Sequence, residues 1–458
     1  MVDRRTPQVT VYITNFNYGC YLDQSVQSVL DQTFQDFELI IIDDGSTDGS
    51  REMIKKYETR EGIFVVFQQN RGLNATNNVA LKLARGKYLM RLDADDFLDP
   101  HALDVMVSTL ERQPETALVF PDYYLVDEQG DVLEQVRRHD FTNDVTLYDQ
   151  PAHGACTMIR RDVLLSLGGY DEAFTRQDGY DLWLNIIQRY QVQNINLPLF
   201  YYRQHDNNLT SDEEQLLATR AQIKEKHVDK RGLKPMSVLA VVPVRGSLSD
   251  PRSLPLEPLG DKLLIDWTLD AVLESQYIDA VIVTTPDENV QTHVRERYGP
   301  KIGVVERQPK LARINTPVED TVLDSLDHYD HHVDAIMLLY VEAPFRSTMH
   351  INDAINTMQL YDVDVVDGVR LDNSLFYVHN GHGLKLWNSG GNLRLERDEL
   401  YRRVGGLHLI RRDFLEKNRT MLGGRIGHIA MDEKAAFYIK SDFDWKVANL
   451  LAEEANQA

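Results

Sequence analysis

The sequence has very few cysteines, with only Cys20 and Cys156 among its 458 residues. So few cysteines exclude a disulfide framework and are typical of proteins from a reducing compartment. The sequence also lacks any uninterrupted apolar run near the length of about 18 residues that crosses a membrane. Its first residues lack the apolar core of a signal peptide. These absences predict a cytoplasmic protein without a transmembrane segment.

Basic residues are scarce relative to acidic ones. The chain has 49 lysines and arginines against 71 aspartates and glutamates, which gives a formal net charge of −22. This charge excludes a general affinity for nucleic acid or for an anionic membrane. Any phosphate binding must therefore be local, through a metal ion, backbone amides and a few basic side chains.

Apolar strands alternate with helical stretches along most of the chain, which predicts βαβ units and parallel sheets. A polar helical run after about residue 211 interrupts the pattern, and a new buried strand begins near Ser237. We therefore predict an α/β protein with two nucleotide-binding, Rossmann-like domains in tandem. The predicted limits are residues 1–210 and 236–458, joined by a helical linker over residues 211–235. The predicted strands are Val9–Thr14, Phe37–Ile42, Phe64–Gln68, Tyr88–Leu92, Ala280–Thr285 and Ala335–Leu339, and the predicted helices of the first domain are Gln24–Gln32, Gly49–Tyr57 and Asn74–Ala84.

Two strands of the first half run directly into carboxylates. The segment IIIDDGSTDGS contains Asp43 and Asp44, and LDADD contains Asp93 and Asp95. Open α/β sheets bind ligands at the carboxyl ends of their strands. There the first pair can accept hydrogen bonds from a base or ribose. The second pair can hold Mg²⁺ or Mn²⁺ beside a diphosphate. Asp178, in QDGYDLWL, suits a general base.

Each of these motifs also has a simpler interpretation. DDGS alone is more often a turn with a helix cap, LDADD can cap the helix that follows it, and Asp178 can be a solvated loop acid. Their occurrence together, in order and at strand ends, favours an enzyme that uses a nucleotide sugar.

Residues 8–210 resemble the family 2 glycosyltransferases of GT-A fold. The resemblance rests on the ordered motifs TNFNY, QSVLDQT, IIIDDGSTDGS, QNRG, ARGKY, LDADD, GGYD, QDGYDLWL and YRQH. It implies direct displacement with inversion at the anomeric carbon, with Asp178 as the catalytic base. It implies a donor, expected to be UDP-linked, and Mn²⁺ or Mg²⁺ as cofactor. The implied donor-binding residues are Thr14, Asn15, Asp43, Asp44, Arg71, Asp93 and Asp95, and the implied metal ligands are Asp95, Asp93 and His205.

The second half has a strand, a loop rich in glycine, serine and proline, and then a helix. Such a loop can wrap a nucleotide triphosphate with backbone amides, although a plain surface loop fits as well. Residues 236–455 resemble the cytidylyltransferases that make CMP-activated nonulosonic acids, such as acylneuraminate cytidylyltransferase. The matching motifs are PVRG, PLG, LLIDWTL, IVTT, APFR, RVGGL and DFD. The resemblance makes Arg245 and Arg346 nucleotide-binding candidates, and Asp442 and Asp444 metal candidates.

This second half departs from the family pattern in its triphosphate loop. Ser249 and Leu254 stand where the family has lysines, and Pro255 stands in place of its asparagine. Serine and leucine cannot make charged contacts with phosphate. We therefore expect a retained fold and nucleotide or sugar pocket, and do not expect cytidylyl transfer unless Arg252 or Lys262 substitutes for the lysines.

The sequence thus predicts a metal-dependent inverting glycosyltransferase of bacterial polysaccharide or glycoconjugate synthesis, followed by a cytidylyltransferase-like domain. The expected acceptor is a saccharide or a lipid-linked saccharide, and the expected assembly is a homo-oligomer formed through the second domain. Peripheral contact with the inner membrane face is an alternative to a purely cytoplasmic location. Two further alternatives are a bifunctional enzyme that also makes a CMP-activated acidic sugar and a non-catalytic nucleotide-binding assembly module.

Overall fold

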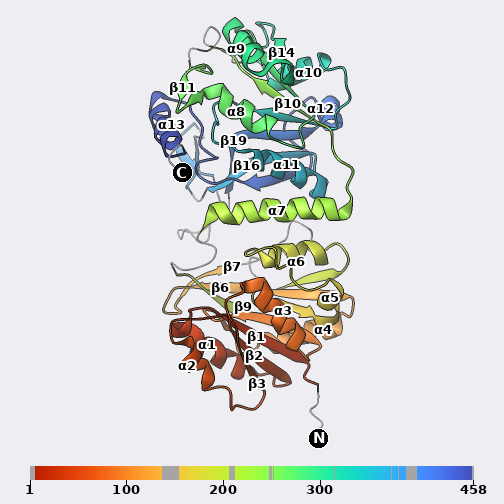
Figure 1. The fold of residues 1–458 in the computed structure, drawn as a ribbon, viewed down its shortest axis with the longest axis vertical. Helices are drawn as coiled ribbons and strands as arrows, with labels where there is room; N and C mark the ends of the chain where they lie inside the picture. The colour runs from red at the N-terminus through yellow and green to blue at the C-terminus, as the bar shows by residue number, and fades with distance from the viewer. Residues whose placement is uncertain are drawn as a thin grey trace. The chain divides into compact units, whose positions relative to one another are not determined.

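The structure of the protein is a computed structural model that describes residues 6–136, 154–205, 212–246, 250, 252–313, 315–372, 374–379, 381–387 and 400–455. The chain forms two compact units, Met1–Asp212 and Glu213–Ala458, coloured from red to yellow and from green to blue in Figure 1. In the part of the chain that is described, no helix has both the length and the apolar character needed to cross a membrane.

The first unit is built on a mixed sheet in the order β3-β2-β1-β4-β8-β6-β9-β5, with β7 paired to β6. Its first four strands are parallel and apolar on both faces because helices cover them. They are β1 (Val9–Asn15), β2 (Phe37–Asp43), β3 (Ile63–Phe67) and β4 (Tyr88–Asp93). The remaining strands are β5 (Phe97–Leu98), β6 (Thr116–Val126), β7 (Val132–Val136), β8 (Met158–Arg160) and β9 (Gln191–Arg203).

The register of the parallel strands brings the acidic motifs to one edge of this sheet. Thr14 of β1 lies opposite Ile42 on one side and opposite Asp93 on the other, and Asn15 lies opposite Asp43. The helices of the unit are α1 (Gly19–Leu30), α2 (Ser50–Lys55), α3 (Leu73–Leu83), α4 (Ala102–Arg112), α5 (Arg161–Ser166) and α6 (Asp178–Ile186). The sheet therefore places residues from distant parts of the chain side by side.

The predicted strands of the first unit are confirmed, each to within one residue at either end. The first helix was predicted from Gln24 but begins at Gly19. Its earlier start has a long-range cause, because the Gly19 amide donates to Asp48 Oδ2 at 2.9 Å. A carboxylate from a distant loop thus caps this helix and satisfies an amide that the helix itself cannot.

The second unit repeats the sheet order of the first over its leading strands. Its sheet runs β14-β13-β10-β15-β19-β16-β20, with β14, β13, β10 and β15 parallel and β19 antiparallel to its neighbours. The strands are β10 (Val238–Pro243), β13 (Ala280–Thr285), β14 (Gly303–Glu306), β15 (Ala335–Leu339), β16 (Val365–Asp372), β19 (Leu400–Arg411) and β20 (Ile426–Ala430). The predicted strands β13 and β15 are confirmed with the expected limits. Both units are thus Rossmann-like, as the sequence predicted.

Helices flank this second sheet, and two small hairpins complete the unit. The helices are α8 (Leu264–Leu273), α9 (Glu288–Tyr298), α10 (Val318–Asp327), α11 (Thr348–Tyr361), α12 (Arg412–Asn418) and α13 (Asp442–Ala455), with a 3-10 turn at Gly299–Lys301. The hairpins are formed by β11 (Pro258–Leu259) with β12 (Lys262–Leu263), and by β17 (Tyr377–His379) with β18 (Leu384–Leu386).

The expected linker is helical, but it is part of the second unit. Helix α7 (Glu213–Arg231) packs on α11, and its Lys224 side chain is buried there. Lys224 Nζ donates to Asp353 Oδ2 and to Thr357 Oγ1, both at 3.0 Å. The buried positions of α7 include Lys224 and His227, so its polar sequence conceals the face that packs on the unit.

Candidate active site

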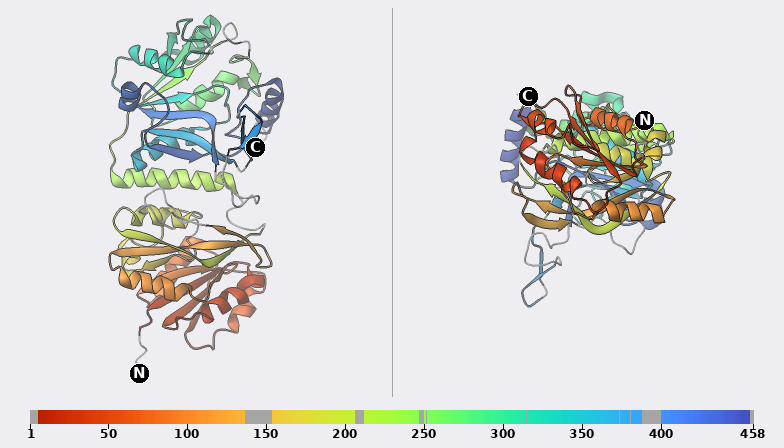
Figure 2. Two further views of the ribbon diagram at one scale, coloured as in Figure 1. Left: turned by 180° about the vertical axis from the view of Figure 1, so that it is seen from behind. Right: turned by 90° about the horizontal axis from the view of Figure 1, so that it is seen from below.

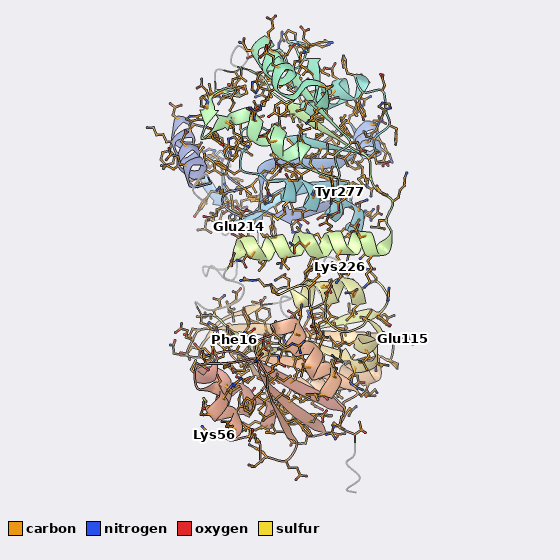
Figure 3. All side chains as sticks on the ribbon, in the orientation of Figure 1. Phe16, Lys56, Glu115, Glu214, Lys226 and Tyr277 are labelled. Carbon is orange, nitrogen blue, oxygen red and sulfur yellow. The ribbon has the colours of Figure 1, made fainter. Side chains whose placement is uncertain are left out.

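The edge of the first sheet carries a closely hydrogen-bonded loop after β2. Asn15 Nδ2 donates to Asp43 Oδ2 at 3.0 Å, and Arg51 Nε and the Ser46 amide donate to Asp43 Oδ1 at 2.9 and 3.1 Å. Burial alone would raise the pKa of Asp43, but these bonds lower it. Because the Asp43 side chain is 0% exposed, its carboxylate stabilises the loop through these internal hydrogen bonds. Phe16, labelled in Figure 3, follows β1 at the same edge and is 44% exposed.

Asp44 fixes the loop that follows β3. Its carboxylate accepts from Gln68 Nε2 at 2.7 Å and from the amides of Arg71 and Gly72 at 2.9 Å each. The neighbouring Gly45 has φ +89°, and a Cβ there would lie 2.6 Å from the Asn70 amide nitrogen, so this turn requires glycine. The Arg71 side chain is exposed and lies 3.7 Å from Glu172. Two loops of the predicted donor site are therefore joined through one aspartate.

The acidic motif after β4 brings three carboxylates close together. Asp93 Oδ1 accepts from Thr14 Oγ1 at 3.0 Å, and Asp96 Oδ1 accepts from the Arg203 amide at 2.9 Å. Asp95 Oδ2 lies 3.0 Å from His205 Nε2. Burial and the neighbouring carboxylates raise the pKa of Asp93 and, more strongly, that of Asp96. This unfavourable concentration of negative charge is what a divalent cation would relieve.

The structure brings together two of the three predicted metal ligands. Asp95 and His205 face each other, and the rings of Tyr18 and Tyr21 lie 5.3 and 5.5 Å from the His205 ring, centroid to centroid. Asp93 instead directs its carboxylate at Thr14 and Arg91. Within the described ranges, no group of three or more acidic, histidine or cysteine side chains has metal-binding geometry. The Asp95 carboxylate still fits a divalent cation, because Mg²⁺ is usually held by one or two carboxylates together with substrate phosphates.

Asp178 is the first residue of α6 and follows Gln177, which has a left-handed backbone with φ +57°. The Asp178 side chain is buried, and its Oδ2 accepts from Arg91 Nη1 and, at 3.3 Å, from Asn77 Nδ2. Arg91 Nε also lies 3.0 Å from Asp93 Oδ1. The predicted base is thereby connected to the predicted metal motif through a single guanidinium group.

Sequence reasoning missed Arg91 and Asn77. The signal for Arg91 was present, because a charged residue stands inside the apolar strand segment YLMRLD. A buried arginine without partners is strongly unfavourable, so its position predicts nearby carboxylates. Asn77 gave no comparable signal, since an asparagine in a helix is most often a surface residue.

The four candidates of the second unit differ in burial and in their partners. Arg346 is fully buried and donates to the carbonyls of Gly405 and Gly406, and this burial lowers its pKa to about 10. Arg245 lies 3.6 Å from Asp250. Asp442 is exposed, and Asp444 accepts from the Lys440 amide and Ser441 Oγ near the start of α13, at 2.9 Å each. The two bonds from Arg346 direct its guanidinium group at the backbone of β19.

Two family descriptions match the chain, one in each unit. Residues 10–168 match "Glycosyl transferase family 2", and residues 252–449 match "Cytidylyltransferase". A putative teichuronic acid biosynthesis glycosyltransferase, TuaG, from Bacillus subtilis is 30% identical over 45% of this chain and 82% of its own length.

The chain belongs to glycosyl transferase family 2.

Another relative of this family 2 chain is an uncharacterized glycosyltransferase from Methanocaldococcus jannaschii. It is 29% identical over 49% of the chain and 81% of its own length. Chondroitin and hyaluronan synthases also match, but the chain covers only 28% and 21% of their respective lengths. Among solved structures, residues 1–349 of TarS from S. aureus in complex with UDP-GlcNAc align with a TM-score of 0.42 and 18% identity, over 48% of this chain and 67% of that one.

Proposed function

We propose that the first unit transfers a sugar from a UDP-linked donor to a hydroxyl group of a saccharide acceptor, free or lipid-linked, in polysaccharide or glycoconjugate synthesis. The observation that carries this proposal is that Arg91 contacts both Asp178 and Asp93, and so links the proposed base to the acidic motif at the end of β4. A general base beside a cation site is the arrangement that an inverting transfer needs. The cytoplasmic location remains part of this proposal, supported by the scarcity of cysteine.

The proposed reaction is a single displacement. The acceptor hydroxyl oxygen attacks the anomeric carbon of the donor and forms the new glycosidic bond. The bond from that carbon to the diphosphate oxygen breaks, and its electron pair leaves with UDP. The hydroxyl proton passes to the carboxylate of Asp178 and from there to solvent. Because attack and departure are on opposite faces, the anomeric configuration inverts.

The residues at the carboxyl ends of β1 and β2 would have different roles in donor binding. Asp44 holds the loop of Arg71 and Gly72 by its amides, so that this loop can face the nucleotide. Thr14 and Asn15 stand at the end of β1 between the two acidic motifs. We assign Asp43 to supporting the loop after β2, because its carboxylate is fully buried.

Asp95 and His205 would hold the cation, with donor phosphate oxygens and water in the remaining positions. A bound Mn²⁺ or Mg²⁺ would neutralise the diphosphate as it leaves. Asp93 would keep its contacts with Arg91 and Thr14 and would not bind the cation directly.

The direct test is UDP release from UDP-glucose, UDP-N-acetylglucosamine and UDP-glucuronic acid by the full chain, with and without Mn²⁺ and with oligosaccharide acceptors. Metal-dependent release of UDP from at least one donor is expected, and it should disappear in Asp95→Asn. If no donor binds in a thermal-shift assay and none is consumed, the proposal is wrong.

We also propose that the chain forms a homo-oligomer through its second unit. In Figure 2, the hairpin of β17 and β18 projects from the rest of that unit. Its strand residues are all exposed, and an isolated two-stranded hairpin is marginal in water. A second copy of the hairpin would supply the same apolar surface in a two-fold contact. Light scattering should give a dimer mass that falls to the monomer mass in Leu384→Asp, and a wild-type monomer at micromolar concentration would contradict it.

Several arginines among the described residues of the second unit already pair with carboxylates. Arg245 and Arg252 both face Asp250, at 3.6 and 3.2 Å, and Arg403 Nε lies 2.6 Å from Asp367. These guanidinium groups would have to leave carboxylates before they could bind phosphate. We therefore propose a nucleotidyltransferase-like unit without cytidylyl transfer activity. Pyrophosphate release from CTP and N-acetylneuraminic acid would show instead a bifunctional enzyme.

A further inference from the structure

Arg91 is a charged residue at the centre of a buried strand. It belongs to β4, and its side chain is only 5% exposed. Burial would lower its pKa, but the attraction of Asp178 and Asp93 outweighs that effect and raises it. The guanidinium group is therefore a permanent positive charge inside the sheet edge, and no step of the proposed displacement uses it.

The geometry of Arg91 joins two carboxylates that have different proposed roles. Its Nη1 donates to Asp178 Oδ2, its Nε lies 3.0 Å from Asp93 Oδ1, and its Nη2 donates to Asp93 Oδ2 at 3.3 Å. A planar guanidinium with several donors can hold two carboxylates in fixed relative positions. A lysine ammonium, as a single point charge on a flexible stem, cannot do so.

A second group of side chains fixes the same oxygen of Asp178. Asn77 Nδ2 donates to Oδ2 at 3.3 Å, and the orientation of its amide is set by Tyr12, whose hydroxyl donates to Asn77 Oδ1 at 3.2 Å. Tyr12 is itself fully buried, and its hydroxyl lies 3.4 Å from that of Tyr170. The bonds from Arg91 and Asn77 both go to Oδ2 of Asp178, and none of the described residues donates to its Oδ1. The two oxygens of Asp178 are therefore not equivalent.

The backbone of Gly154 closes over the ion pair. A Cβ on this residue would lie 2.8 Å from Asp178 Oδ2 and 3.2 Å from both Nη atoms of Arg91. Only glycine fits here without moving the pair. The Arg91–Asp178 contact is thus restrained by the bond from Asn77 and by the backbone of Gly154.

We propose that Arg91 is a positioning residue, which holds Asp178 by Oδ2 so that Oδ1 is presented to the acceptor hydroxyl. This inference rests on the proposed transferase function. Buried ion pairs contribute little net stability compared with apolar side chains of similar size. An arginine at this position is therefore better explained by the fixed geometry that it imposes than by the stability of the fold. Because Arg91 also holds Asp93, it keeps the base at a constant distance from the acidic motif.

The test replaces Arg91 by lysine in the full chain, with Arg160→Lys as the matched control. Arg160 lies on the neighbouring strand β8 and donates to the carbonyls of Thr116 and Leu110, and to neither Asp178 nor Asp93. The probe is whichever of UDP-glucose, UDP-N-acetylglucosamine and UDP-glucuronic acid the wild type hydrolyses fastest with Mn²⁺. We expect Arg91→Lys to lower kcat by about 100-fold, the scale of a misplacement near 1 Å, with the donor KM nearly unchanged.

Arg160→Lys should leave both kinetic constants close to those of the wild type. Gly154→Ala is the second variant, since it disturbs the pair without removing a charge and should also lower kcat more than it changes KM. The proposal is overturned if kcat is normal in both Arg91→Lys and Gly154→Ala. It is also overturned if these variants change only the donor KM.

A crystal structure of Arg91→Lys separates this inference from the transferase function. The Asp178 side chain should leave the position it has in the wild type, and an unmoved Asp178 overturns the positioning role even if no UDP-sugar is turned over. A wild type that consumes no donor, together with a displaced Asp178 in the variant, refutes the transferase function and retains the positioning role.

Discussion

The substitution Asp178→Asn should remove the proposed base while it preserves the structure around it. The asparagine carbonyl can take the place of Oδ2 and accept from Arg91 and Asn77, and its NH₂ group takes the place of Oδ1. Arg91 keeps Asp93 as a charged partner at 3.0 Å, so it is not left as an isolated buried charge. The fold and the donor site should therefore survive the change.

The size of the kinetic effect follows from the role of the removed group. General base catalysis contributes about 10²–10⁴-fold to rate. A factor of ten in rate is about 1.4 kcal/mol, so the barrier should rise by about 3–5 kcal/mol. Donor affinity should change by less than about threefold, because both hydrogen bonds to the protein are kept. The expected signature is a large fall in kcat at nearly constant donor affinity.

The assay measures UDP release with Mn²⁺ at saturating donor, and donor affinity by calorimetry on the same preparations. Asp162→Asn is a suitable control, since Asp162 is also an acidic residue in the first turn of a helix, α5, and its carboxylate contacts only the backbone amide of Val163 in the bonds that are described. Turnover by Asp178→Asn within threefold of the wild type would refute the assignment of the base. A loss of donor binding equal to the loss of turnover would show that Asp178 belongs to the donor site instead.

Three further predictions concern the metal, the unit boundary and the end of the chain. EDTA should abolish UDP release and Mn²⁺ should restore it, with recovery absent in His205→Ala if Asp95 and His205 hold the ion; full activity in EDTA would exclude the metal role. Lys224→Met should destabilise the second unit by about 3 kcal/mol in urea denaturation, because it leaves Asp353 buried without its cation, and adding Asp353→Leu should recover most of the loss. A smaller loss that Asp353→Leu does not recover would mean that α7 is not anchored by this pair. Asp444→Ala should not change Mn²⁺ binding measured by calorimetry, and a weaker affinity would restore Asp444 as a ligand.

Much of the fold could be predicted because its parallel strands are short apolar runs bounded by polar residues. Strand β13, for example, reads as an unbroken apolar and β-branched run, so the limits Ala280–Thr285 follow from composition. The start of α1 could not be predicted, because Asp48 caps it from another loop. The placement of α7 was likewise hidden, since a buried lysine resembles a solvated one until its partner Asp353 is known.

The sequence named candidate site residues, but it did not predict the contacts between them. The sequence predicted that the acidic motifs lie at the carboxyl ends of parallel strands, whereas the pairing of Thr14 with Asp93 is known only from the strand register. The approach of Asp178 could not be predicted, since α6 enters the site from a part of the chain far beyond the parallel strands. Arg91 shows how a sequence can still report such a contact, because an arginine in an apolar strand requires carboxylates that the local sequence supplies only in part.

The two units share a sheet order but have opposite electrostatic arrangements at the candidate sites. In the first, burial and mutual repulsion raise the pKa of Asp93 and Asp96, so the site has an excess of negative charge that a cation would stabilise. In the second, Arg245, Arg252 and Arg403 already pair with carboxylates, and burial also raises the pKa of Glu342 beside Arg245. A nucleotide triphosphate placed there would displace these carboxylates and bring several negative charges toward a buried acid, both of which are unfavourable. We therefore expect a metal-bound diphosphate in the first unit and no triphosphate in the second.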